Sequence, residues 1–128
     1  MALRTDLRVL VVDDMSVSRQ VLGQMLDQIG IRQVITCASA EEALAALAKK
    51  PIDLVISDLN MPGMDGIELL KAMRGISKCR ATPFILTSAL DSSPRFAEAR
   101  ANGMRSLLIK PFQIDLLLHC VEHAFGRI

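Results

Sequence analysis

The chain has 128 residues, 51% of them hydrophobic, and its 15 basic and 14 acidic side chains give a net charge of +1. This length supports one domain with a sizeable core, expected to span residues 1–128. The near-neutral charge provides no positive electrostatic potential that would attract nucleic acid or an anionic membrane. Aromatic residues make up 3% of the chain, which leaves few rings for stacking on bases.

Sorting signals and cysteine frameworks are not evident in the sequence. No apolar run approaches the roughly 20 residues of a membrane-spanning helix, and residues 1–8 lack the apolar stretch of a signal peptide. Cys37, Cys79 and Cys120 are odd in number and widely spaced, which indicates neither a disulfide framework nor a CxxC metal site. These features predict a cytoplasmic, reduced protein.

The first predicted strand is an apolar run at residues 8–14 that ends on two aspartates. Hydrophobic positions then recur at helical spacing between Ser16, the expected N-cap, and Gly30, the expected stop. A β-branched run at residues 34–38 predicts the second strand. The S-x-x-E capping box at residues 39–42 opens the second helix, which a proline ends.

The central predicted strand is the apolar run at residues 54–56, which reads as buried on both faces and ends on Asp58. A loop rich in Gly, Pro and Asn follows, and a capping box at residues 65–68 then opens a third helix that stops before Gly75. A carboxylate at the carboxyl end of a buried strand is where open α/β sheets place their chemistry. Asp58 is therefore the first candidate functional residue.

The last part of the chain predicts two further strand and helix pairs. Residues 84–88 form a strand that ends on hydroxyl groups, and residues 94–102 form the helix after it. Residues 104–109 form the fifth strand, which ends on Lys110, and residues 114–125 form the last helix.

Five strands thus alternate with five helices, which predicts an α/β fold, a doubly wound (βα)5 parallel sheet with helices on both faces. The carboxyl ends of all five strands then lie along one edge of the sheet. The polar residues at that edge are Asp13, Asp14, Asp58, Thr87, Ser88 and Lys110.

This set of side chains points to phosphoryl transfer. Three neighbouring carboxylates repel one another unless a cation is present, and oxygen ligands without His or Cys favour Mg²⁺ over zinc. Lys110 and Thr87 supply a positive charge and a donor for phosphoryl oxygens. Because an aspartate can itself be the nucleophile, we expect the phosphoryl acceptor to belong to the protein.

These motifs resemble the receiver domain of two-component response regulators over the whole chain, in order and spacing. The resemblance rests on Asp13-Asp14, Asp58 within DLNMPGMDG, Thr87-Ser88 and Lys110-Pro111. The short length and residues 57–74 are particularly similar to the single-domain chemotaxis members, the CheY-like proteins. The resemblance implies the flavodoxin-like, CheY-like form of the fold.

The resemblance also implies a role for each acidic position. Asp58 would be the phosphoacceptor. Asp14, Asp58 and the backbone carbonyl of Asn60 would ligate Mg²⁺ directly, and Asp13 would act through water.

On the basic side, Lys110 would pair with the phosphoryl group, its bond to Pro111 would be cis, and Thr87 would be the switch hydroxyl. One position departs from the family pattern. Three residues before the lysine, where the family often has Tyr or Phe, this chain has Leu107, which puts the usual coupling of threonine to an aromatic ring in doubt.

The implied function is a monomeric phospho-accepting switch, not a substrate-converting enzyme. It would receive a phosphoryl group from a histidine kinase and bind a flagellar motor-switch protein or a phosphatase through the fourth helix, fifth strand and fifth helix. Arg95, Arg100 and Arg105 lie on or beside that face, either as docking residues or as solubilising charge. A phosphorelay intermediate or a phosphate sink would use the same site.

Other functions fit the sequence less well. Phosphatases of the haloacid-dehalogenase type also use Mg²⁺ and an aspartate nucleophile, but they carry DxD on the first strand, whereas here Asp58 and Asn60 follow the third. A degenerate receiver acting as a scaffold is disfavoured because all five site positions are present. His119 and His123 have a zinc-compatible spacing with no evident third ligand, so a solvated helix face is expected there.

Overall fold

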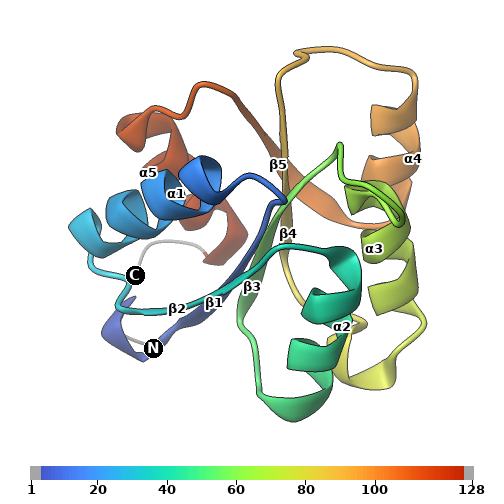
Figure 1. The fold of residues 1–128 in the computed structure, drawn as a ribbon, viewed down its shortest axis with the longest axis horizontal. Helices are drawn as coiled ribbons and strands as arrows, with labels where there is room; N and C mark the ends of the chain where they lie inside the picture. The colour runs from blue at the N-terminus through green and yellow to red at the C-terminus, as the bar shows by residue number, and fades with distance from the viewer. Residues whose placement is uncertain (1–3, 126–128) are drawn as a thin grey trace.

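The computed structural model describes residues 4–125 and contains one parallel sheet flanked by helices (Figure 1). The strands are β1 (Arg8–Val12), β2 (Gln33–Cys37), β3 (Leu54–Asp58), β4 (Phe84–Ser88) and β5 (Met104–Ile109). The α-helices are α1 (Ser16–Gln28), α2 (Ala40–Lys49), α3 (Gly66–Arg74), α4 (Arg95–Ala101) and α5 (Ile114–Phe125). Two 3-10 turns, η1 (Arg4–Asp6) and η2 (Ser77–Cys79), complete the described elements.

The strand order is β2-β1-β3-β4-β5 and every pairing is parallel, which confirms the predicted doubly wound α/β sheet. The chain therefore places α1 and α5 on one face of the sheet and α2, α3 and α4 on the other (Figure 1). Each face has its own apolar cluster. All residues of β3 and β4 are buried, as expected for central strands covered on both sides.

Of the two capping boxes predicted from the sequence, one forms completely and the other forms in part. Asp65 and Glu68 form the complete predicted capping box. Ser39 accepts from the Glu42 backbone N–H at 3.2 Å, but the Glu42 carboxylate accepts from the backbone N–H of Ala38, so only half of that box forms.

Ser16 is not an N-cap, which makes that prediction wrong. The N-cap position of α1 is Met15, whose side chain makes no capping hydrogen bond. The Asp13 carboxylate accepts the Met15 backbone N–H at 2.9 Å instead. The turn into α1 is thus organised by the same aspartate that belongs to the candidate site.

No helix among residues 4–125 has both the length and the apolar character needed to cross a membrane. The three cysteines are free and buried.

Candidate functional site

Four strands of the sheet bring the predicted polar residues to one edge. Asp13 and Asp14 directly follow β1, and Asp58 is the last residue of β3. Thr87, in β4, is the register partner of Asp58 on the neighbouring strand. Lys110 follows β5, where its backbone N–H donates to the Ser88 carbonyl at 2.8 Å. The parallel register therefore gathers residues that are far apart in the sequence.

The three aspartates form one carboxylate cluster. One side-chain oxygen of each of Asp13, Asp14 and Asp58 lies within 4.8 Å of the others. Asp13 and Asp58 are buried, at 1% and 6% exposure, whereas Asp14 is exposed. Burying two carboxylates this close together is unfavourable unless a positive charge compensates them.

Lys110 provides part of that compensation. Its Nζ lies 3.0 Å from Asp13 Oδ2 and 3.3 Å from Asp58 Oδ2. Burial by itself would lower the pKa of Lys110, but the hydrogen bond to Asp13 and the field of Asp58 outweigh it and raise this pKa. The lysine is therefore charged at neutral pH.

One lysine does not neutralise the cluster. The pKa of Asp58 is raised, first by burial and then by the charge of Asp13, and the attraction of Lys110 opposes this shift without cancelling it. The folded protein thus holds a carboxylate whose charged form is disfavoured. A bound cation would relieve this, because it adds the missing positive charge at the point where the three carboxylates meet.

The residues present fit Mg²⁺. The donors of the cluster are all carboxylate oxygens, which hard cations prefer, and the exposed Asp14 leaves the site open to water and to a phosphoryl group. Asn60 is exposed, two residues beyond Asp58. Its carbonyl as a metal ligand stays a prediction.

Thr87 carries an unsatisfied hydroxyl. The residue is buried, and its Oγ1 has no hydrogen-bond partner among residues 4–125. A buried hydroxyl without a partner is unfavourable and marks a place where a further group is expected. On the strand next to Asp58, the hydroxyl suits a phosphoryl oxygen bound to that aspartate.

Sequence reasoning missed two residues that hold the site together. Gly66, the first residue of α3, packs so closely that a Cβ atom there would lie 2.2 Å from the Asp58 carbonyl oxygen. Arg19 of α1 donates from Nη1 to the Asp13 carbonyl at 2.7 Å and so fixes the turn after β1. In the sequence, Gly66 indicates only a break after the third strand, because its close approach to Asp58 is a tertiary contact.

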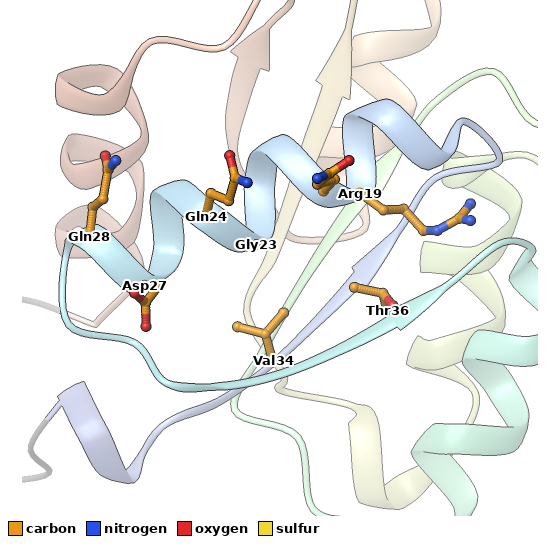
Figure 2. A pocket seen from close by; sticks show the side chains of 8 residues that line it. Arg19, Gly23, Gln24, Asp27, Gln28, Val34 and Thr36 are labelled. Atoms are coloured by element: carbon orange, nitrogen blue, oxygen red, sulfur yellow. The ribbon is translucent and has the colours of Figure 1, made fainter.

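A hollow of about 590 Å³ between α1 and the edge strand β2 is separate from this cluster (Figure 2). Most of the residues that line it are of polar type, among them Arg19, Gln24 and Asp27. None of the three clustered aspartates lines it, so its size does not make it the centre of the chemistry.

The remaining predicted positions lie elsewhere. His119 and His123 are exposed on α5, and the Asp13, Asp14 and Asp58 cluster is the single group of three or more potential metal ligands among residues 4–125. Leu107 is half-buried, pairs with Leu86 in register, and packs against the apolar cluster on the α2, α3 and α4 face. The Lys110-Pro111 peptide bond is cis, as the resemblance implies.

The fold and the cluster agree with the comparisons to known proteins. The family model of the response regulator receiver domain matches residues 9–122. The probable chemotaxis protein CheY of Rhizobium etli is 34% identical over 128 residues, covering 100% of this chain and 99% of that protein. The chain belongs to the response regulator receiver family.

Solved structures give the same result. Chemotaxis protein CheY4 of Vibrio cholerae superimposes with a TM-score of 0.87 at 36% identity, covering 93% of this chain and 98% of that one. The receiver domain of the sensor histidine kinase PA1611 of Pseudomonas aeruginosa, whose structure has a magnesium ion coordinated in its active-site cleft, gives a TM-score of 0.84 at 25% identity, covering 94% and 98%. This protein is thus a CheY-like receiver domain of two-component signalling.

Proposed function

We propose that Asp58 accepts a phosphoryl group from a phosphohistidine of a histidine kinase, and that the phosphorylated protein then binds a partner in chemotaxis. The observation that carries this proposal is the buried Thr87 hydroxyl without a partner, beside a carboxylate whose charge is only partly compensated. Both features are unfavourable in the protein alone and become favourable when a phosphoryl group and a cation are bound.

The transfer uses the side chains as follows. A carboxylate oxygen of Asp58 forms a bond to phosphorus while the bond from phosphorus to the histidine nitrogen breaks, and its electron pair stays on the imidazole. Lys110, held by Asp13, supplies a fixed positive charge to the phosphoryl oxygens, and Thr87 donates its unpaired hydroxyl to one of them. Mg²⁺, when bound by Asp14, Asp58 and the Asn60 carbonyl and through water by Asp13, would neutralise the remaining negative charge.

An apolar surface beside the site suits docking of the phosphoryl donor. Met15 and Val17, at the start of α1, are 56% and 65% exposed. They line a hollow of about 440 Å³ with Ser18, Val21, Lys110, Pro111 and Phe112. Because this hollow includes Lys110, a kinase helix seated there would lie next to the acceptor. The α4, β5 and α5 side remains free for an output partner, for which the flagellar switch is our proposal.

Labelling of Asp58 tests the acceptor assignment. We expect mass spectrometry to show one added phosphoryl group after treatment with acetyl phosphate and Mg²⁺, and no addition without Mg²⁺. Asp58→Asn should not be labelled, whereas Asp91→Asn, at an exposed aspartate of the β4–α4 loop, should be labelled like the wild type. Equal labelling of Asp58→Asn and the wild type would show that the acceptor is another residue.

A further inference from the structure

A second charged feature lies at the opposite end of the sheet from Asp58. A hollow of about 380 Å³, here called the basic hollow, is lined by Arg74, Arg80, Ala81, Gly103, Met104 and Arg105. These residues come from the end of α3, the loop before β4 and the start of β5. Three arginines therefore lie around the amino ends of β4 and β5, whereas the carboxyl ends of these strands lie beside the carboxylate cluster.

Arg74 is fixed in this hollow by backbone carbonyls. Its Nε donates to Asn102 O at 2.7 Å, and its Nη1 donates to Cys79 O at 3.0 Å and Thr82 O at 2.8 Å. Gly103 has a φ of 93°, and a Cβ there would lie 3.0 Å from Arg74 Nη2, so the turn between α4 and β5 closes directly over the guanidinium. The positive charge of Arg74 is thus held in place without a carboxylate partner among the described residues.

The hollow contains no acidic lining residue, and its arginines repel one another. Burial, followed by the charge of Arg105, lowers the pKa of Arg74. Arg80 and Arg105 are exposed and form no ion pair with any residue in 4–125. Because the whole chain has a net charge of only +1, this excess of positive charge is a local feature of the surface around the hollow.

We propose that the basic hollow binds the diphosphate group of a small molecule. The exposed guanidinium groups of Arg80 and Arg105 can each match phosphate oxygens with two parallel N–H donors, and three positive charges without a carboxylate favour a ligand with several negative charges. The volume, about 380 Å³, lies in the range of about 300 to 1,000 Å³ typical of small-molecule sites. Arg80 and Arg105 provide the free donors, and Arg74 provides the fixed charge between the η2 loop and the α4–β5 turn.

The proposal is tested with inorganic pyrophosphate in Mg²⁺-free buffer at physiological ionic strength, followed by backbone amide NMR. We expect saturable shifts at residues 79–82 and 103–105, with little change around Asp58. The double variant Arg80→Gln/Arg105→Gln should bind at least about tenfold more weakly, because it loses two charge-assisted contacts. Arg74 is left intact because it holds the fold.

The matched control is Lys49→Gln/Lys50→Gln, which removes the same charge from the exposed end of α2. It should bind pyrophosphate like the wild type. A thermal scan provides a second readout, since pyrophosphate should raise the Tm of the wild type and the control more than that of the arginine variant, with sodium chloride at equal ionic strength as the reference. Shifts that do not saturate, that weaken equally in both double variants, or that centre on Lys110 would mean an adventitious ion only and would overturn the proposal.

Discussion

At the scale of single residues, the site depends on a glycine that carries no chemistry. Gly66 lies against the backbone of Asp58, and a Cβ there would also come within 3.0 Å of Leu86 Cδ1. Backbone cannot move aside as a flexible side chain can. Asp58 and the start of α3 are therefore positioned together by the absence of a side chain at residue 66.

The first prediction compares two glycine substitutions. Gly66→Ala should destabilise the protein by at least about 1 to 3 kcal/mol, the usual range for overpacking, and should reduce phosphorylation of Asp58. Gly23→Ala should instead stabilise it by about 1 kcal/mol, because glycine is a poor helix former and Gly23 lies inside α1, where an added methyl group would meet nothing within 4 Å (Figure 2). Urea unfolding measures both, and a Gly66→Ala protein as stable as the wild type would contradict the close approach.

The second prediction concerns the charge of Asp58. Between the ordinary pKa of 3.8 and the higher value in the folded protein, the folded state retains a proton that the unfolded chain has released. Stability therefore falls as the pH rises through this window, and the loss persists at neutral pH. Without Mg²⁺, Asp58→Asn should be more stable than the wild type at pH 7, and the difference should disappear below the ordinary pKa.

Thermal unfolding of both proteins across this pH range measures the effect, with Asp91→Asn as the control for loss of an exposed aspartate. If Asp58→Asn were less stable than the wild type at pH 7, the ion pair with Lys110 would outweigh the burial of the carboxylate.

At the scale of elements, α3 and α4 are joined through the cap of α3. Asp65 accepts the Glu68 backbone N–H at 2.9 Å and also forms an ion pair with Arg95, the first residue of α4. Burial alone would raise the pKa of Asp65, but the hydrogen bond from Arg95 and those from the helix backbone lower it. The carboxylate thus stabilises the folded state above its ordinary pKa, and this contribution is lost as the pH falls through the lowered value.

The third prediction separates the cap from the ion pair. Asp65→Ala should cost about 1 kcal/mol or somewhat more, since it removes both interactions, whereas Asp65→Asn keeps the cap and should lose only the ion pair, up to about 1 kcal/mol. High salt should reduce the effect of Asp65→Asn and leave most of the effect of Asp65→Ala. Urea unfolding at two salt concentrations decides this. Equal losses in both variants would mean that the side-chain cap contributes nothing.

At the scale of the whole molecule, the carboxylate cluster exists only when the sheet is assembled. Asp13 and Asp14 follow β1 and Asp58 ends β3, so the unfolded chain offers no comparable site. A ligand that binds only the folded state stabilises it in proportion to the logarithm of its concentration.

The fourth prediction is that Mg²⁺ raises the Tm. At 100 times its Kd, Mg²⁺ should add about 2.7 kcal/mol to the free energy of unfolding. Asp14→Asn should lose most of this gain, because Asp14 is the exposed member of the cluster, while Asp91→Asn should retain it. Differential scanning calorimetry with and without Mg²⁺ measures the shift. The same shift in Asp14→Asn and in the wild type would place the ion elsewhere.

The order of the elements and the chemical nature of the sheet edge follow from the amino-acid sequence alone. Strands β4 and β5 and helix α5 occupy the predicted residues, and β2 differs by one residue, because hydrophobic periodicity and Gly or Pro breaks are local properties of the chain. The placement of Asp58, Thr87 and Lys110 at one edge of the sheet also follows from the sequence, since parallel strands bring their carboxyl ends together.

How these residues interact is set by the packing of the folded chain. The contact of Gly66 with Asp58, the hydrogen bond from the Met15 backbone N–H to Asp13 in the turn before α1, and the placement of Leu107 beside Leu86 all depend on strand register and on packing between elements. So do the unpaired hydroxyl of Thr87 and the raised pKa of Asp58. Local patterns encode the period and the ends of each element, but distances and burial across the sheet arise only when residues far apart in the chain are packed together.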